Sequence, residues 1–474
     1  MVSSEGVWAP PPGTPTRHGW RTPVTAPGPR GAALLRSFGT MRREPLEYLN
    51  QIWTAYGDVV QFPIPSPPTY LVSSPQGVRR VLQDNHRAYG KRTIQYDALS
   101  LVTGEGLLTA DAEVWRPMRR RVQPAFHHEA TSRVAHHVSV AAQALSATWS
   151  ASIGSRPSAI IDVHQAMMEA TVDVVGASLF GADLSGDARE LAAATVQALD
   201  VVVARARMPL PIPGWLPTPN NVRLRRHVQT LDRCVGALVR ERRRAGGDDR
   251  APDMLDLLLA QDAGGRLLSP EHVRNEVVTF LVAGHETVAS ALSWALLLLA
   301  QSPQWTGGVR TEVDALGESL TIDALAQLPM TRAVVDETLR LYPPAWVITR
   351  RALANDVVEG HRIPAGALVV MSPWLVHRHP DAWDSPESFD PRRFLGEAGA
   401  NRTAYLPFGA GPRLCVGRDF ALVEATLTLA HILRAFELRP LPGRTPRALP
   451  SVTLRPDGGL PMLVRHRGGF SAWS

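Results

Sequence analysis

Cysteine is scarce in this chain: only Cys234 and Cys415 occur among its 474 residues. Two cysteines cannot form the disulfide framework of a small secreted domain, so the sequence indicates a reducing cytosol. The first 40 residues are rich in proline, and they lack the apolar core of a signal peptide or a membrane anchor. A Gly-x-Gly-x-x-Gly motif after a strand is also missing, which argues against a flavin- or nicotinamide-binding segment.

The chain has little excess charge of either sign and one long apolar run. The 50 basic and 44 acidic residues leave a formal net charge of +6, which fits solubility or an acidic protein partner and gives no indication of nucleic acid. The one long apolar run covers 277–300, with His285 and Glu286 near its middle. A charge there would be costly inside a bilayer, so we expect a buried core helix and no membrane span.

What the chain does contain is enough apolar sequence for a substantial core. Hydrophobic residues make up 45% and charged residues 20% of the chain. Helical spacing predominates up to Pro343, and strand-like alternation occurs near 58–62, 69–72, 346–350, 357–363, 367–372 and 451–465. Residues 88–108 are predicted to be mostly irregular. We predict one mainly α-helical domain with a small β part over 41–474, preceded by a proline-rich lead-in over 1–40.

The most informative stretch runs from Phe408 to Gly417 and reads FGAGPRLCVG. It places Cys415 in a glycine-rich turn directly before a helical pattern. Main-chain N–H groups of such a turn, and the positive end of the helix dipole, stabilise a thiolate. A free thiol, with a pKa of about 8.5, is mostly protonated at neutral pH, so a metal-binding cysteine needs this stabilisation. Taken alone, Cys415 could equally be a buried structural cysteine.

Four separate motifs together resemble the cytochrome P-450 family. FGAGPRLCVGRDFA is similar to its haem-binding signature, AGHETVAS to its oxygen-activation motif, ETLRLYPP to its Glu-x-x-Arg and WRPMR to its Trp-x-x-x-Arg. Their order and spacing fit the family from about Pro45 onward. The resemblance implies the family's fold, a helical bundle around a haem with small β-sheets.

The resemblance also implies which residues contact the cofactor, which is expected to be haem b (iron protoporphyrin IX). Cys415 would be the axial thiolate ligand of the iron. The positions expected to surround the haem and this ligand are Phe408, Gly411, Gly417, Ala421, Ala283 and Gly284. Glycine at 411 and 417 would let the backbone approach the cofactor closely.

Arginine side chains would hold the haem propionates, because a guanidinium group matches a carboxylate through paired hydrogen bonds. The family pattern assigns this role to Arg413, and to Trp115 together with Arg119. On a later strand either Arg350 or Arg351 could contribute, and the family's spacing favours Arg351. The alternative for each arginine is a solvated surface charge.

Near this motif the further arginines Arg116, Arg120 and Arg121 could dock an acidic electron donor or could simply face solvent. Pro117 is compatible with the helix only if the helix starts near Glu113, because proline is tolerated in a first turn.

Glu286 and Thr287 resemble the family's acid–alcohol pair, in which the hydroxyl holds a water near bound dioxygen and the acid relays protons. Val288 replaces a hydroxyl residue that is frequent there, which removes one group from that relay. The alternative is that Thr287 bonds the carbonyl four residues earlier and that Glu286 is a paired core charge.

The family pattern assigns a structural role to Glu337 and Arg340, which share a helix face, and to Arg393. This network would hold the cysteine loop in place. The expected substrate contacts are mostly apolar and, apart from Ala283, could equally be core residues. They are Tyr96, Leu99, Val102, Ala283, Ala345, Trp346 and Val347.

The sequence thus predicts a cytoplasmic, bacterial haem-thiolate monooxygenase of secondary metabolism. Its substrates would be dioxygen and a lipophilic small molecule, with terpenoid or fatty-acyl compounds favoured and macrolides or steroids behind them. Electrons would come from a separate ferredoxin or flavodoxin with its reductase. The alternatives are a peroxide-driven enzyme and a non-catalytic haem-binding protein of the same fold.

Overall fold

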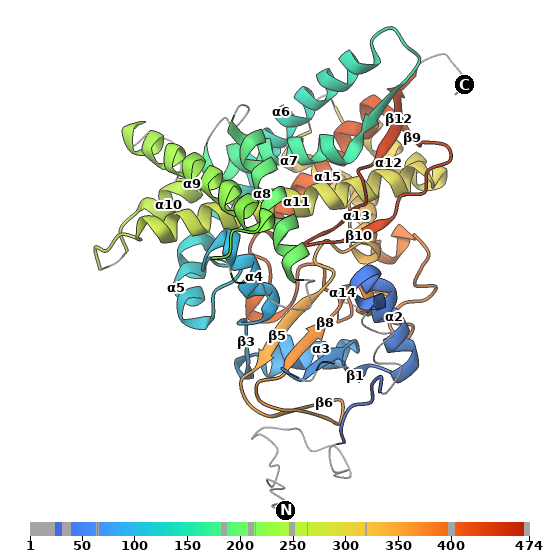
Figure 1. Ribbon diagram of the computed structural model, residues 1–474. Coiled ribbons are helices and arrows are strands. Elements are labelled where there is room, and N and C mark those ends of the chain that lie inside the picture. The colour runs from blue at the N-terminus through green and yellow to red at the C-terminus, as the bar shows by residue number, and fades with distance from the viewer. Residues whose placement is uncertain are drawn as a thin grey trace, which may run out of the picture. The chain divides into compact units, whose positions relative to one another are not determined.

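The computed structural model describes residues 24–30, 39–62, 64, 66–181, 187–206, 213, 215–245, 252–262, 264–317, 320–396 and 403–468. The chain divides into two compact units, which we describe separately (Figure 1). Unit 1 takes its residues from 1–93, 347–386 and 401–414, and unit 2 from 94–346, 387–400 and 415–474. The predicted lead-in over 1–40 lies mostly outside the described residues.

Unit 1 is organised around a five-stranded sheet. Its elements are α2 (Pro45–Tyr56), β1 (Val59–Gln61), β2 (Thr69–Val72), α3 (Pro75–Arg79), the π-helix η1 (Arg80–Asp84), the 3-10 helix η2 (His86–Ala88), β3 (Tyr89–Gly90), β5 (Ile348–Ala352), β6 (Asp356–Val358), β7 (His361–Ile363), β8 (Leu368–Met371), α14 (Pro373–Val376) and the 3-10 helix η6 (Gly411–Arg413). The strand order is β1-β2-β8-β5-β3, and β6 pairs with β7 as a separate hairpin. Only β2 and β8 run parallel within the large sheet. All residues of β2 and β8 are buried, as the continuous apolar runs of central strands require.

Unit 2 contains most of the helices and two small sheets. Its elements are α4 (Ile94–Thr103), α5 (Ala112–Val122), η3 (Gln123–Phe126), α6 (His128–Ile153), β4 (Ala159–Asp162), α7 (Val163–Phe180), α8 (Asp187–Ala206), α9 (Pro219–Ala245), α10 (Met254–Leu259), α11 (Pro270–Ala300), α12 (Pro303–Ala315), η4 (Ile322–Gln327), α13 (Pro329–Leu341), η5 (Pro391–Phe394), α15 (Arg418–Ala435), β9 (Phe436–Pro440), β10 (Ala448–Pro450), β11 (Leu454–Pro456) and β12 (Pro461–His466). The sheets are β4-β12-β9 and β10-β11, both antiparallel. This mainly α-helical architecture with a small β part confirms the predicted fold class.

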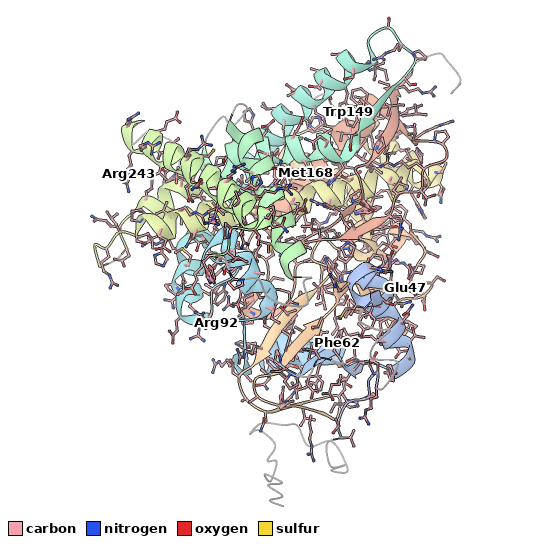
Figure 2. The ribbon with its side chains drawn as sticks, in the orientation of Figure 1. Glu47, Phe62, Arg92, Trp149, Met168 and Arg243 are labelled. Carbon is pink, nitrogen blue, oxygen red and sulfur yellow. The ribbon has the colours of Figure 1, made fainter. Side chains whose placement is uncertain are left out.

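Helix α11 forms the centre of unit 2. Pro270 occupies its first turn, and the Ser269 side chain accepts a hydrogen bond from the His272 N–H, so the helix start is well capped. By length and composition α11 could cross a membrane, but 78% of its most apolar window is buried by the rest of the protein. Helix α11 is therefore a core helix. Helix α6, which carries the buried Trp149, lies in the same unit (Figure 2).

The prediction for residues 88–108 was wrong, since they contain strand β3 and helix α4. The buried side chains of α4 include Leu99, Val102 and Thr103, which have helical spacing. Nearby polar residues of the helix, such as Asp97 and Ser100, make that period hard to recognise in the sequence. The correction matters because the expected substrate contacts Tyr96, Leu99 and Val102 lie on this helix.

Candidate functional site

Cys415 lies in unit 2, in the turn that leads into α15, and its side chain is accessible to solvent. Surrounding protein atoms nevertheless desolvate the sulfur and raise the pKa of its thiol. The Gly417 N–H donates a hydrogen bond to the sulfur, and the positive charges of Arg119 and Arg418 also favour the thiolate. A reachable sulfur with these anion-stabilising neighbours is a suitable ligand for a metal ion.

The glycines before Cys415 are required by the local backbone of unit 1. Gly411 has φ +70°, and a Cβ atom built on it would lie 2.0 Å from the main-chain oxygen of Leu82 in η1. The turn therefore packs directly against the π-helix, which no side chain at position 411 would permit. Phe408 and Arg413 belong to the same unit and are half-buried.

The glycine and alanine after Cys415 belong to unit 2. A Cβ on Gly417 would stand 3.4 Å from the Phe126 ring, which is a tight but tolerable contact. Ala421 follows one turn into α15 and is half-buried.

Helix α5 presents Trp115 and Arg119 one turn apart on one face, where both are half-buried. The helix begins at Ala112, so Pro117 lies in its interior and not in the first turn as expected. Arg116 and Arg120 are exposed. Arg121 instead donates to the carbonyls of Leu257 and Ala260, at 3.3 and 2.7 Å, and so caps the end of α10.

A short accessible stripe interrupts the buried surface of α11. From Val277 to Leu297 every residue is buried except Ala283, Gly284 and Thr287. These three share one helix face, because Thr287 is four positions from Ala283 and three from Gly284. Gly284 also has a packing role, since its Cβ would lie 2.8 Å from the Val175 side chain of α7.

Thr287 and Glu286 make the contacts expected of a purely structural role, in which Thr287 bonds the carbonyl four residues earlier and Glu286 is a paired core charge. The Thr287 hydroxyl donates to the Ala283 carbonyl at 2.8 Å, which leaves its lone pairs available as acceptors. Glu286 is buried, and burial raises the pKa of its carboxyl, although Arg455 and Thr453 act to lower it.

The partners of Glu286 come from the far end of the chain. Thr453 Oγ1 donates to Glu286 Oε1 at 2.8 Å, and Arg455 Nη1 lies 3.6 Å from the same oxygen. Arg455 also pairs with Asp200 at 2.6 Å, and Asp200 is about half exposed (48% of its side chain). Sequence reasoning did not find these partners, because no local pattern links positions separated by 167 residues.

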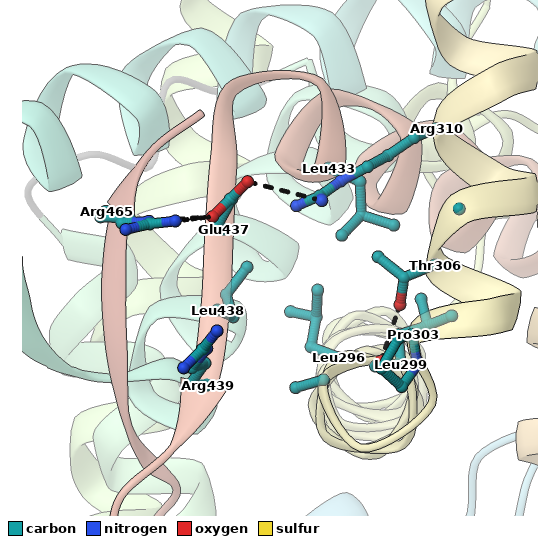
Figure 3. Close-up of a pocket in the computed structure, with 12 residues that line it drawn as sticks. Leu296, Leu299, Pro303, Thr306, Arg310, Leu433, Glu437, Leu438, Arg439 and Arg465 are labelled. Carbon is teal, nitrogen blue, oxygen red and sulfur yellow. Dashed lines mark hydrogen bonds and ion pairs between the residues drawn. The ribbon is translucent and has the colours of Figure 1, made fainter. Parts of the chain in front are cut away.

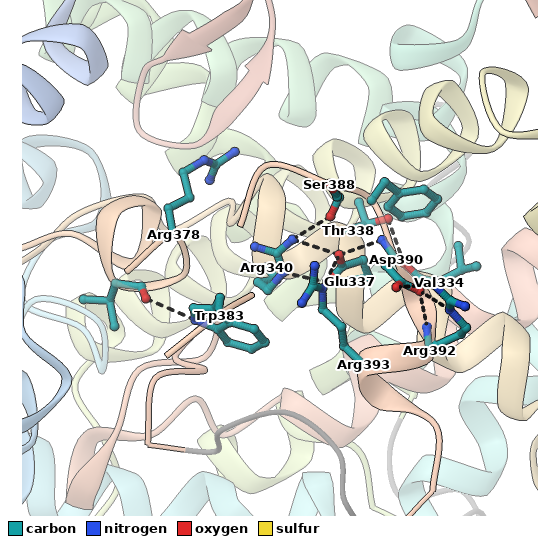
Figure 4. Close-up of polar contacts among 12 residues, drawn as sticks. Val334, Glu337, Thr338, Arg340, Arg378, Trp383, Ser388, Asp390, Arg392 and Arg393 are labelled. Atoms are coloured by element: carbon teal, nitrogen blue, oxygen red, sulfur yellow. Dashed lines mark hydrogen bonds and ion pairs between the residues drawn. The ribbon is translucent and has the colours of Figure 1, made fainter. Parts of the chain in front are cut away.

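Glu337 and Arg340 form a fully buried ion pair on α13 (Figure 4). Arg340 Nε and Nη2 donate to the two Glu337 oxygens at 2.7 and 2.8 Å, and Arg340 also donates to the Ser388 carbonyl at 3.0 Å. Glu337 Oε1 accepts the Asp390 N–H at 2.9 Å and lies 3.4 Å from Arg393 Nε. The network thus ties α13 to the segment around η5.

On strand β5 of unit 1, Arg350 and Arg351 point to opposite faces. Arg350 is buried and donates to the carbonyl of Thr349 at 2.8 Å. Arg351 is exposed, and its guanidinium group is therefore accessible to a carboxylate ligand.

The expected substrate contacts have different environments. Leu99 and Val102 are buried, Tyr96 is half-buried, and Ala345 is exposed. Trp346 is half-buried and its indole N–H donates to the Ser451 carbonyl at 3.0 Å, so its ring is held in place. Val347 is half-buried and opens a segment of unit 1.

The donor set of these residues fits a haem better than a bare metal ion. Among the described residues no group of three or more His, Cys, Asp or Glu side chains could hold a metal. A single accessible thiol with anion-stabilising neighbours suits the axial position of a haem iron, where the porphyrin supplies the other ligands. The basic group of Arg119, near the sulfur, suits the carboxylates that a haem carries.

Comparison with known proteins agrees with this geometry. The family model described as "Cytochrome P450" matches residues 27–460. The chain is 35% identical over 461 residues to cyclooctatin synthase of Streptomyces melanosporofaciens, an alignment that covers 95% of this chain and 97% of that protein. It is 36% identical over 439 residues to cyclooctat-9-en-7-ol 5-monooxygenase of the same organism, with coverage of 91% and 92%.

A solved structure also resembles this chain. The crystal structure of CYP175A1 from Thermus thermophillus superposes with a TM-score of 0.73 at 33% identity, and the match covers 94% of this chain and all of that one. The family match, the two relatives and this fold all extend over nearly the whole chain. The chain therefore belongs to the cytochrome P450 family, and it is a haem-thiolate monooxygenase.

Proposed function

We propose that this P450 hydroxylates or otherwise oxidises a terpenoid with haem b and dioxygen. The two electrons would come from a separate ferredoxin or flavodoxin and its reductase. Fatty-acyl compounds are the second substrate class, with macrolides and steroids behind them. The observation that carries the proposal is the presence, in one unit, of an accessible thiol at Cys415 and an accessible stripe on the buried helix α11. Relatives named for cyclooctatin and cyclooctat-9-en-7-ol support the terpenoid class.

The same proposal places the enzyme in the cytoplasm and assigns its catalytic function to residues 41–474. The family match over residues 27–460 supports the assignment of the catalytic function to residues 41–474.

Cys415 is the proposed iron ligand, and its neighbours set the charge of its sulfur. Burial raises the pKa of this thiol, and the Gly417 N–H and the Arg119 charge oppose that effect and favour the thiolate that would bind iron. Arg119 with Trp115, Arg413 and Arg351 are the proposed partners of the haem carboxylates. When bound, the haem supplies the reductive activation of dioxygen.

Thr287 and Glu286 are proposed to take part in proton transfer. The Thr287 hydroxyl donates to Ala283, so it can accept a hydrogen bond from a water on the accessible face of α11. The Glu286 carboxyl has a raised pKa, and its Oε2 has no hydrogen-bond partner in the part of the chain that the structure describes, so this carboxyl can hold a proton inside the protein. Arg455 and Asp200 connect it to the surface.

The proton role is tested by coupling efficiency, the fraction of NADPH consumption that yields product. Thr287→Ala should lower coupling several-fold, whereas Thr287→Ser, which keeps the hydroxyl, should retain most of it. Equal coupling in wild type and Thr287→Ala would remove Thr287 from the mechanism.

The electron donor is proposed to dock where Arg116 and Arg120 are exposed. Replacing both by Gln should slow reduction by a ferredoxin or flavodoxin, and the slowing should diminish as ionic strength rises. Arg121→Gln is the matched control for charge, because that side chain is used to cap α10. An effect confined to Arg121→Gln would contradict the proposed docking face.

The substrate class is tested on holoprotein with a panel of terpenoids, fatty acids, steroids and macrolides. A substrate should displace the water on the iron, shift the Soret band and give an oxidised product with surrogate ferredoxin and reductase. A Soret shift and product with fatty acids alone would reject the terpenoid class. Binding without product, with either the redox proteins or hydrogen peroxide, would favour a non-catalytic carrier.

The ligand assignment has its own test. Reduced holoprotein under carbon monoxide should show the thiolate-type Soret band, and Cys415→Ser should bind haem without that band. A well-folded wild-type holoprotein that lacks the band would refute Cys415 as the ligand.

A further inference from the structure

A cavity lies in unit 2 (Figure 3). It has a volume of about 310 Å³ and is formed by the end of α11, the start of α12, the end of α15 and strands β9 and β12. Leu296 on its wall follows Thr287 by nine positions on α11, which is about 14 Å along a helix axis. The cavity is therefore distinct from the site of Thr287 and Glu286, which are proposed to take part in proton transfer.

The walls of this cavity separate into an apolar and a basic part. Leu296, Leu433 and Leu438 are buried leucines that line it. Figure 3 shows Arg310 extending from α12 on one side, and Arg465 and Arg439 on the strands opposite. Glu437 is the one acidic residue among those that line the cavity.

Glu437 does not neutralise this basic wall. Its Oε2 already accepts two hydrogen bonds from Arg465, at 2.8 and 2.6 Å. Arg310 obtains only a 3.5 Å contact with Glu437 Oε1 and a 3.5 Å hydrogen bond to the Phe436 carbonyl. The nearby acid Asp314 is held by both terminal nitrogens of Arg467. The carboxylate partner of Arg310 is thus Glu437 alone, at a long distance and shared with Arg465.

The partly buried position of Arg310 also lowers the stability of the folded protein. Its Nε is buried and has no hydrogen-bond partner among the described residues, and burial lowers the pKa of its guanidinium group. An unsatisfied buried donor on a charged group is destabilising. The side chain as a whole is 23% exposed, and a guanidinium group that a ligand can reach can donate two parallel hydrogen bonds to a carboxylate.

We propose that this cavity is a binding site for a small amphiphilic anion, whose head group binds Arg310 and whose apolar body lies on the leucines. The excess of arginine over acid on the wall disfavours cations and leaves a neutral lipid without compensation for Arg310. At about 30 Å³ per water molecule, 310 Å³ corresponds to roughly ten waters, which suits a medium-chain carboxylate and excludes a long-chain lipid.

The test uses holoprotein whose haem is occupied by a coordinating azole, so that the substrate pocket cannot contribute. Isothermal titration calorimetry with decanoate should then give one site, whereas decanol and decylamine should bind at least about tenfold more weakly. Decyl phosphate distinguishes the head groups: tighter binding than decanoate assigns the site to a phosphate-bearing ligand, and weaker binding assigns it to a carboxylate.

Two variants with matched controls locate the site. Arg310→Gln should raise the Kd for decanoate at least about tenfold, whereas Arg332→Gln, which removes a charge on the exposed side of α13, should not. Gly307→Phe should block the cavity, because a Cβ at that position meets no atom within 4 Å, whereas Gly307→Ala should leave binding intact.

Three results would overturn the proposal: no decanoate binding to azole-bound holoprotein, equal binding of decanol, or an unchanged Kd in both Arg310→Gln and Gly307→Phe. In each case Arg310 would act only as a cap on the Phe436 carbonyl.

Discussion

Replacing Glu337 by Gln should destabilise unit 2 strongly, because it removes one charge of a buried pair. Glu337 and Arg340 are both 0% exposed, and two hydrogen bonds of 2.7 and 2.8 Å join them. Breaking a buried pair typically costs about 3–5 kcal/mol, since the remaining charge stays buried without its partner. Glu337→Gln should lie at the upper end, because Arg393 also loses its carboxylate.

Arg340→Met provides the internal comparison. In that variant Glu337 keeps the Asp390 N–H and the Arg393 side chain, so the loss should be smaller than in Glu337→Gln. Arg332→Gln breaks a surface ion pair on the same helix and should cost at most about 1 kcal/mol.

The assay is urea denaturation of holoprotein followed by far-ultraviolet circular dichroism, with the haem-to-protein ratio recorded in parallel. A cost below about 1 kcal/mol for Glu337→Gln, or a larger loss in Arg340→Met than in Glu337→Gln, would refute the reasoning.

Three further predictions concern buried groups and the cysteine turn. Gly411→Ala should cost about 2–5 kcal/mol from its left-handed backbone and the contact with η1, whereas Gly409→Ala, at φ +72° with its nearest atom at 3.8 Å, should cost about 1–2; similar losses in urea denaturation would contradict this. Glu424 is fully buried, both of its oxygens lack partners, and burial raises its pKa well above the usual value. The folded protein therefore keeps a proton that the unfolded chain loses above about pH 4.5, so stability should fall by up to about 1.4 kcal/mol per pH unit as the pH rises, and Glu424→Gln should remove that slope; parallel stability curves would argue against it. The buried Asp356 is paired with Arg80, and Asp356→Asn should destabilise unit 1 by about 3–5 kcal/mol at pH 7, with the gap closing as the pH falls through the lowered pKa of this carboxyl; a gap that is constant between pH 7 and pH 3 would contradict the pairing.

The sequence predicted those parts of the fold that depend on local pattern. Helix α2 covers Pro45–Tyr56, and local signals in the sequence mark both of its ends, because a proline starts it and Gly57, at φ +91°, ends it. Strand β9 was not anticipated, since it follows α15 without a break and only its pairing with β12 distinguishes it from helix. Helix α4 was missed because few apolar residues mark its buried face.

For the candidate site, the sequence identified the chemistry but not the contacts that arise from folding. Cys415, Glu337 and Thr287 stand in short motifs whose residue types carry the prediction. Thr453 and Arg455 do not, because their proximity to Glu286 depends on the return of the last strands to α11. The start of α5 was expected near Glu113 and lies one residue earlier, at Ala112, so Pro117 is in the helix interior and not in its first turn.

The long separation between Glu286 and its partners has a consequence for synthesis of the protein. Thr453 is made 167 residues after Glu286, and at 5–20 residues per second this interval is on the order of ten to thirty seconds on the ribosome. Throughout that interval α11 carries a carboxylate that its final environment will bury, with its described partners not yet translated. The nascent chain should therefore delay closing its core around α11 until the last strands emerge.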